Sequence, residues 1–175
     1  ASGKYSTAMG YYTTASGNYS TAMGLGTIAS GYLSTAMGIY NVGDGNKTNW
    51  IETDPLFEIG NGTQSSTRRN ALTVLKNGYV GFGTATPSAG LHIKASTWPG
   101  SFIYLEANTG GDTGLRFYEG SSDKWHIYNS SAGGGLRIAN TAAQIAIFFQ
   151  QSNSNVGIGT TTPFYKLQVG NAGDG

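Results

Sequence analysis

The chain has 175 residues, of which 28 are glycine and none is cysteine, and ten Lys or Arg against nine Asp or Glu give a net charge of +1. The lack of cysteine excludes disulfide frameworks and thiolate metal sites, and the dispersed charge excludes the basic patch of a nucleic-acid-binding protein. Because no run of 18 apolar residues occurs, this segment is not expected to insert in a membrane. Abundant glycine, only 11% charged residues and no long helical period favour an elongated all-β protein made of several small modules.

Residues 1–42 contain one phrase written three times with a period of 14 residues: ASGKYSTAMGYYTT, ASGNYSTAMGLGTI and ASGYLSTAMGIYNV. A fixed short period indicates a stack of equivalent coils rather than one folded unit. The glycines disfavour a helix, since each would cost about 1 kcal/mol relative to alanine. We therefore predict two short strands and two turns in each coil.

Stacking at the spacing of β-strands would place identical side chains in columns. Strand alternation puts Thr7 and Met9 on one face of the first coil, and Ser6 and Ala8 on the other. The expected columns are Met9, Met23 and Met37, and also Tyr5, Tyr19 and Leu33. We expect the methionine column, including Met23, to be buried by stacking and by chain association, because one coil cannot bury its own apolar face.

The repeated phrase ASGNYSTAMG, at this period, resembles the head repeats of trimeric autotransporter adhesins over residues 1–42. The resemblance implies a short left-handed parallel β-roll within a homotrimer. We place this module at residues 1–43, because that stretch has one charged side chain and residues 44–58 have five.

The next module is predicted at residues 44–94, as a cap followed by a β connector. The segment GDGNKTNWIETDP is expected to cap the last coil, with Trp50 and Ile51 covering its apolar end and Pro55 stopping strand pairing. After it, LFEIGNG and ALTVLKNGYVGFG read as strands, and Asn77-Gly78 is typical of a hairpin turn.

Part of this connector recurs 76 residues later, since NGYVGFGTATPSAGLHI (77–93) aligns with NSNVGIGTTTPFYKLQV (153–169). Residues 153–175 therefore form a second connector copy. The glycines at 81, 83, 157 and 159 indicate close approach of backbones, for which a threefold axis is one explanation. These segments resemble phage tail-fibre and bacterial surface-fibre proteins, which often carry an endosialidase-type C-terminal chaperone. No chaperone of that type is expected in these residues, and the start at Ala1 rather than Met favours an excerpt or a processed fragment.

Residues 95–152, between the two connector copies, are predicted to form a small antiparallel β domain, either one sheet or a sandwich. Five strands are expected: SFIYLEAN, GLRFYEG, DKWHIYN, GLRIAN and AQIAIFFQQ. Alternation assigns one face to the core, with the residues Leu115, Phe117, Trp125, Ile127, Leu136 and Ile138. The opposite face then collects the candidate binding residues Arg116, Tyr118, His126, Tyr128 and Arg137.

These five side chains suit a receptor site, because aromatic rings stack on sugars while Arg donates to hydroxyl or carboxylate oxygens. A contact within the trimer and a solvated sheet face are the alternatives. No metal site is expected from His92 and His126, the two histidines, and Asp44-Gly45-Asn46 favours a plain turn over a calcium loop.

No catalytic residue and no cofactor are predicted, because nucleotide-binding and hydrolase motifs are missing. The pairs Glu52 with Asp54, and Glu119 with Asp123, would suit glycoside hydrolysis only if the fold brought them to the required spacing.

The sequence therefore favours a non-enzymatic segment of an extracellular homotrimeric fibre, in a phage virion or on a bacterial surface. Its expected role is attachment to a cell-surface glycan or protein receptor. A fibre-borne glycan depolymerase and a purely structural filament subunit are the alternatives.

Overall fold

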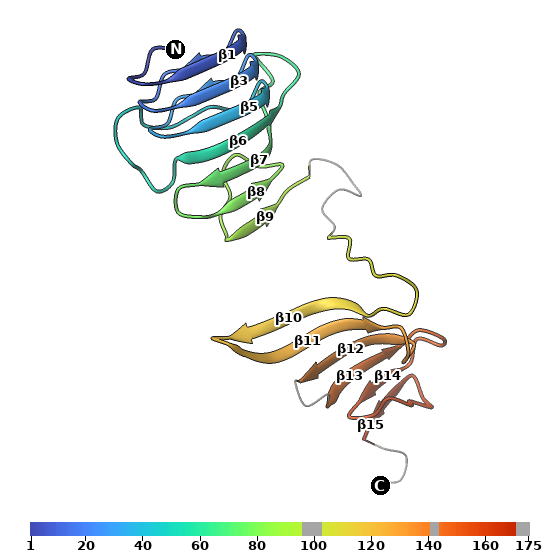
Figure 1. Cartoon of the computed structure of the whole chain (residues 1–175). Coiled ribbons are helices and arrows are strands. Elements are labelled where there is room, and N and C mark those ends of the chain that lie inside the picture. The colour runs from blue at the N-terminus through green and yellow to red at the C-terminus, as the bar shows by residue number, and fades with distance from the viewer. Residues whose placement is uncertain (96–102, 141–143, 171–175) are drawn as a thin grey trace. The chain divides into compact units, whose positions relative to one another are not determined.

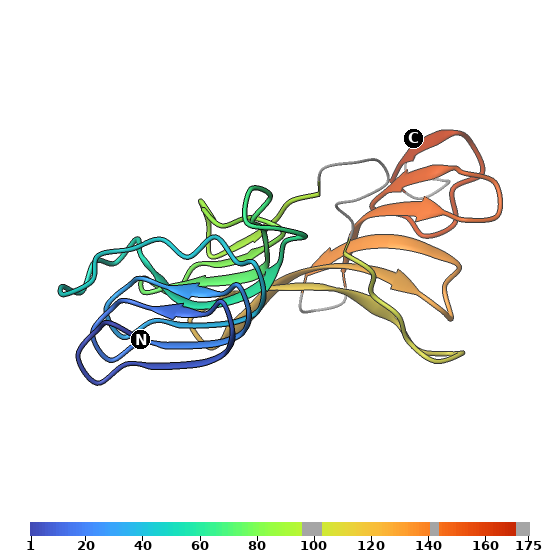
Figure 2. The same ribbon diagram turned by 90° about the horizontal axis from the view of Figure 1, so that it is seen from above.

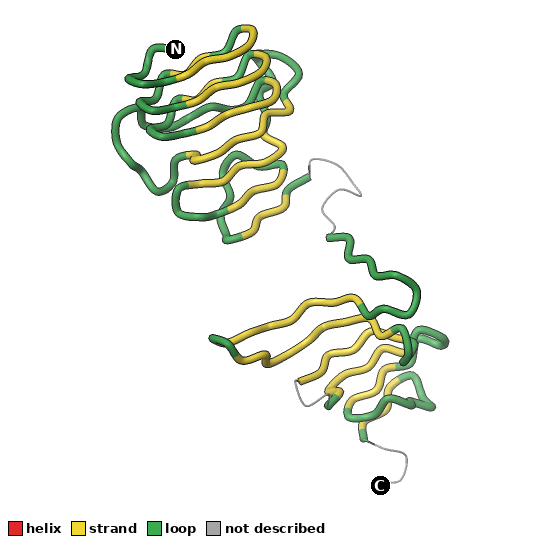
Figure 3. The backbone as a smooth tube through the Cα atoms, in the orientation of Figure 1, coloured by secondary structure: helices red, strands yellow, loops and turns green. Residues whose placement is uncertain are grey.

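The computed structural model describes residues 1–95, 103–140 and 144–170, and these form strands, turns and loops without a helix (Figure 3). The chain divides into two compact units, Ala1–Phe102 and Ile103–Gly175. The described residues of unit 1 form a sheet of seven strands and a separate one of two, and those of unit 2 form a sheet of six (Figure 1). The all-β prediction is thus confirmed. No helix that could cross a membrane occurs in the described ranges.

Each 14-residue repeat forms one coil with a long and a short strand. The strands are β1 (Thr7–Tyr11), β2 (Thr14–Ala15), β3 (Thr21–Leu25), β4 (Ile28–Ala29) and β5 (Thr35–Ile39). The long strands pair in parallel with a register shift of one repeat, so that Met9, Met23 and Met37 are aligned. The short strands β2 and β4 form a second parallel ladder, and successive coils follow similar paths (Figure 2). This is the predicted stack of coils.

The interior of the stack is filled by small side chains, with alanines as its apolar core, and not by methionine. Ala15, Ala22, Ala29 and Ala36 form the buried core, with Ala8 packed against it. Met23 points to the other face of the sheet and is 38% exposed. Stacking of the coils within one chain therefore does not bury the methionine column, because the interior is filled by small side chains such as Ala22, Ser20 and Thr27. The methionine column is instead part of the outer face, and its burial by chain association stays a prediction.

The turns of successive coils also form columns. Tyr5, Tyr19 and Leu33 all have positive φ angles, between 53° and 58°, and the rings of Tyr5 and Tyr19 stack with centroids 5.3 Å apart. Non-glycine residues rarely adopt this left-handed conformation. The expected column is confirmed, and its backbone is strained in the same way in every coil.

The sheet of unit 1 continues beyond the repeats. Its later strands are β6 (Pro55–Asn61), β7 (Asn70–Leu75), β8 (Val80–Phe82) and β9 (Leu91–Ile93). Strand β6 pairs in parallel with β5, and β7 pairs with β6 and β8 in antiparallel fashion. Asn77 and Gly78 form the turn between β7 and β8, as predicted, with the Gly78 amide donating to the Leu75 carbonyl at 3.0 Å.

The segment at 44–54 does not cap the roll. It runs beside the coils, where the Lys47 carbonyl accepts from the Asn18 amide at 2.9 Å and the Asn46 carbonyl accepts from the Tyr32 amide at 2.6 Å. Trp50 and Ile51 are exposed, and Pro55 begins a paired strand rather than stopping pairing. The cap prediction is therefore corrected: the coil stack ends against β6.

A buried carboxylate marks the end of the alanine row. Glu58 is aligned with Ala36 on one side and with Thr73 on the other. Its carboxylate accepts from the side-chain amides of Asn41 at 2.5 Å and Asn70 at 2.6 Å. Burial raises its pKa more than these hydrogen bonds lower it. The apolar interior thus closes with a hydrogen-bonded polar group.

Unit 2 is one mainly antiparallel sheet. Its strands are β10 (Thr113–Glu119), β11 (Ser122–Ser130), β12 (Gly135–Asn140), β13 (Ile145–Gln150), β14 (Val156–Ile158) and β15 (Leu167–Val169). The strands from β10 to β14 pair in antiparallel order. Four of the five expected strands are confirmed. The first is wrong where it can be judged, because residues 103–108 form no strand and residues 101–102 lie outside the described residues.

The two connector copies have the same local structure. Strands β8 and β9 pair in parallel, as do β14 and β15, and both Gly83 and Gly159 have φ angles of +72°. A side chain at Gly81 would collide with Thr84, and one at Gly157 would collide with Thr160. Contacts within one chain therefore account for the close backbone approach at these two glycines.

One face of each sheet carries an unbroken apolar row. Aligned residues give the row Met9, Met23, Met37, Ile59, Leu72, Phe82 and Ile93 in unit 1. The row in unit 2 is Leu115, Ile127, Ile138, Ile147, Ile158 and Val169. We call these the unit 1 row and the unit 2 row. Both consist of exposed or half-buried side chains.

Candidate functional site

The predicted binding residues come from three neighbouring strands of unit 2. Arg116 on β10 is aligned with His126 on β11, and Tyr128 on β11 is aligned with Arg137 on β12. A register shift between Phe117 and Tyr118 places Tyr118 opposite Asp123. Four of the five residues therefore form two cross-strand pairs. Tyr118 lies beyond the register shift and is not paired with any of them.

The faces of this sheet differ from the prediction. The supposed core residues Leu115 and Phe117 are each 47% exposed, and Trp125 and Leu136 are exposed as well. On the opposite face Ala139 and Phe148 are buried, and the Arg137 guanidinium lies 5.4 Å from the Phe148 ring centre. The core assignment is therefore wrong within this unit: arginine and aromatic side chains cover their own face, whereas no described residue of unit 2 covers the apolar face.

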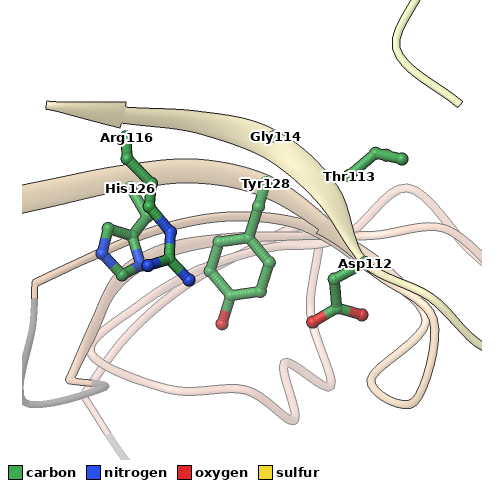
Figure 4. Close-up of a pocket in the computed structure, with 6 residues that line it drawn as sticks. All are labelled: Asp112, Thr113, Gly114, Arg116, His126 and Tyr128. Atoms are coloured by element: carbon green, nitrogen blue, oxygen red, sulfur yellow. The ribbon is translucent and has the colours of Figure 1, made fainter. Parts of the chain in front are cut away.

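Three of the five predicted residues, Arg116, His126 and Tyr128, line one cavity of about 360 Å³. In Figure 4 these side chains and that of Asp112 point to the same side of β10 and β11. The His126 and Tyr128 rings lie 6.2 Å apart, edge to face. Tyr118 and Arg137 are not among the lining residues. We call this space the β10–β11 cavity.

An acidic residue holds the imidazole and guanidinium side by side. Asp123 Oδ2 lies 2.7 Å from His126 Nε2 and 3.6 Å from Arg116 Nη1. The Arg116 side chain is 65% exposed, so this longer pair adds little stability. The guanidinium therefore keeps donors free for a ligand, while the shorter contact fixes the ring of His126.

Sequence reasoning missed the other lining residues, because Asp112 and Thr113 precede the expected strand GLRFYEG and Gly114, its first residue, has no side chain to suggest a site. Asp112 Oδ1 accepts from the Ser131 amide at 2.8 Å and from its hydroxyl at 3.1 Å, which fixes the edge of the cavity. Any side chain at Gly114 would collide with Tyr128. The glycine therefore leaves room for the tyrosine, and a glycine opposite an aromatic residue was the available signal.

The other acidic candidates make structural contacts. Asp54 Oδ2 accepts from the Asn46 amide at 2.7 Å and lies 3.7 Å from Lys76 Nζ, and Glu119 pairs with Lys124 at 3.3 Å. Asp44 Oδ1 accepts from the Gly45 amide at 2.8 Å, as the plain-turn interpretation expects.

The described part of the chain contains no group of three His, Cys, Asp or Glu side chains that could hold a metal ion. His92 and His126 lie in different units.

The repeats can be compared with known families once this geometry is established. Residues 1–27 match two copies of the YadA head domain repeat. These two repeats are thus similar to adhesin head repeats, in agreement with the stacked coils of unit 1. No curated protein matches the sequence. The resemblance of the later segments to phage tail-fibre and bacterial surface-fibre proteins stays a prediction.

Proposed function

We propose that this chain is a non-enzymatic segment of an extracellular homotrimeric fibre that attaches to a cell surface, either in a phage tail fibre or as a bacterial surface adhesin. The observation that carries the proposal is the YadA head repeat within a solenoid whose outer face is apolar. Its repeats supply an elongated and regular support. The second unit supplies a polar cavity suited to a receptor.

The apolar rows support association with further copies of the chain. The unit 1 row crosses seven strands, and strands spaced about 4.8 Å apart make it about 29 Å long. Monomeric soluble proteins rarely leave contiguous apolar surfaces of this kind in water. Each square ångström of apolar surface removed from water contributes about 25 cal/mol, which is set against the entropic cost of association. Facing rows of three identical chains would bury these side chains around a common axis.

The β10–β11 cavity supports recognition of a cell-surface glycan. Tyr128 offers a ring for stacking and a hydroxyl for hydrogen bonding, and Arg116 offers a forked donor to sugar hydroxyls or carboxylates. Asp112 adds an acceptor at the edge. Tyr118 and Arg137 lie outside the lining and would extend the contact beyond it.

Binding to a glycan array and to immobilised cells tests the receptor site. The double substitution Arg116→Ala with Tyr128→Ala is expected to reduce binding at least tenfold and to leave assembly and the melting temperature unchanged. Tyr165→Ala is the matched control, because Tyr165 is an exposed tyrosine of the same unit that does not line the cavity. Unchanged binding by the double variant contradicts the glycan site, and loss of assembly reassigns this face to the trimer contact.

A further inference from the structure

Unit 1 contains a second cavity, of about 470 Å³, beside the first connector copy. The lining side chains that can bind a ligand are Asn61, Arg68, Arg69, Thr84, Thr86 and Lys94. They come from the end of β6, the loop before β7, and the segments on either side of β9. We call this space the basic cavity.

The charged side chains that line the basic cavity are all positive. Two arginines and one lysine line it, and no lining residue is acidic. The buried acid Glu58 accepts from the side-chain amide of the lining residue Asn70 at 2.6 Å, and it forms no ion pair with any of these cations among the described residues. Neither Arg69 nor Lys94 forms an ion pair within the described ranges. Two of the three cations are therefore available to an anion.

The three cations do not have the same role. Arg68 Nη1 donates to the carbonyls of Gly26 at 2.7 Å and Asn41 at 3.0 Å, and its guanidinium lies 5.5 Å from the Tyr40 ring centre. Arg68 therefore ties the loop to the last coil. Arg69 and Lys94 are exposed and have no comparable structural contact among the described residues.

Backbone hydrogen bonds fix the positions from which Arg69 and Lys94 extend. The Arg69 amide donates to the Tyr40 carbonyl at 3.1 Å, and the Arg69 carbonyl accepts from the Asn61 amide at 3.0 Å. The Lys94 amide donates to the Phe82 carbonyl at 2.9 Å. Both cations are thus held on ordered backbone, which lowers the entropic cost of binding an anion between them.

Unit 2 forms a matching hairpin, β12–β13, and the second connector copy without these cations. The Gly170 amide donates to the Ile158 carbonyl at 2.8 Å, as the Lys94 amide does to Phe82, and the Gln144 carbonyl accepts from the Asn140 amide at 3.1 Å, as that of Arg69 does from Asn61. Neutral Gln144 and Gly170 therefore stand at the places of Arg69 and Lys94. The same strand pairings therefore form without the positive charges, and the fold does not require them.

We propose that the basic cavity binds a carboxylate or sulfate group of an acidic polysaccharide. Arg69 and Lys94 would donate to the anionic group, since charge-assisted hydrogen bonds to such oxygens are about twice as strong as neutral ones. The exposed amide of Asn61 and hydroxyl of Thr86 would bond neighbouring sugar hydroxyls. These neutral groups among the cations favour a saccharide over an acidic peptide. The proposal is independent of the β10–β11 cavity, which lies in the other unit.

Titration calorimetry of the full chain, in its native assembly, tests this site. The probes are a sulfated heparin oligosaccharide, an oligogalacturonate, inorganic sulfate, neutral dextran and polyglutamate. At least one of the two acidic oligosaccharides is expected to bind, and to bind more weakly as salt concentration rises. The double substitution Arg69→Gln with Lys94→Gln is expected to raise its dissociation constant at least tenfold. If that variant melts early, Lys94→Gln alone is expected to raise the constant at least threefold.

The matched control is Lys4→Gln with Lys47→Gln, which removes the same charge from exposed positions of the same unit outside the cavity. Retained binding by this control supports the site, whereas an equal loss means that net charge alone attracts the probe. Three other results overturn the proposal: unchanged affinity in the Arg69 and Lys94 variant, equal affinity for polyglutamate, and binding of inorganic sulfate without either oligosaccharide.

Discussion

The two sheets of this chain solve the same packing problem in different ways. Unit 1 wraps its sheet into coils and buries a column of alanines inside them, of which Ala22 is 0% exposed. Unit 2 spreads its strands as one layer, with Phe148 and Ala139 as its fully buried apolar residues in the described ranges. Both leave one apolar row uncovered. Coiling therefore supplies a core within one chain, whereas an open sheet depends on another surface for most of its burial.

Substitutions at two neighbouring residues of β3 test the interior and the outer face of unit 1 separately. Ala22→Asp places an unpaired charge among alanines and is expected to cost about 4 kcal/mol or more of unfolding free energy. Met23→Asp places the same charge on the outer row and is expected to leave the coils folded while weakening assembly. Urea unfolding followed by circular dichroism measures the first effect, and sedimentation measures the second. Equal loss of coil stability in both variants would contradict the assignment of the two faces.

An acidic substitution in the unit 2 row tests the dependence of the open sheet on association. Ile127→Asp is expected to cost about 2–3 kcal/mol and to increase amide hydrogen exchange across strands β10 to β14. Ser122→Asp, on an exposed residue at the start of the same strand, serves as the control. Equal protection of amides from exchange in the two variants would mean that the apolar row is not buried by association.

The sequence predicted the repeats well because a period of 14 residues forces identical side chains into register, as Met9, Met23 and Met37 show. It did not predict which face lies inside, because alternation defines two faces and only the size of the coil decides between alanine and methionine. The cap prediction was wrong because backbone hydrogen bonds to Asn18 and Tyr32 hold this segment beside the coils, and the sequence does not show backbone hydrogen bonds.

The candidate site in unit 2 was predicted in part. Alternation brought Arg116, His126 and Tyr128 together correctly, because regular strands keep alternate residues on one face. The irregularity after Phe117 was not visible in the sequence, so the position of Tyr118 could not be predicted. The basic cavity was missed because its side chains are brought together by pairing between segments that are distant in the sequence.

The buried carboxylate at the end of the alanine row should make the stability of unit 1 depend on pH. The pKa of Glu58 is raised above its ordinary value of 4.5, chiefly by burial. The folded chain then holds the proton more tightly than the unfolded chain. Stability is therefore expected to fall as pH rises from about 4.5 through the raised pKa, by at most about 1.4 kcal/mol per pH unit, and to level off above it. Urea titrations at several pH values measure this slope, and Glu58→Gln should flatten it. A slope that persists in the variant would assign it to another group.

The smallest expected change in stability comes from the turn column of Tyr5, Tyr19 and Leu33, whose φ angles are positive. Leu33 has a φ angle of +57°, which asparagine adopts more readily than leucine. Leu33→Asn is expected to stabilise unit 1 by up to about 1 kcal/mol. Leu33→Ala is the control, because it shortens the side chain without relieving the backbone. A melting temperature that rises equally in both variants would show that the gain does not come from the φ angle.

Light scattering of the purified chain tests the central claim most directly, because the apolar rows of both units are proposed to face copies of the same chain. The expected molar mass is three times that of the 18.2 kDa chain, at micromolar concentration and in ordinary salt. Met23→Asp combined with Ile127→Asp should reduce it toward that of a single chain. A folded wild-type monomer, stable at the same concentration, would contradict the account.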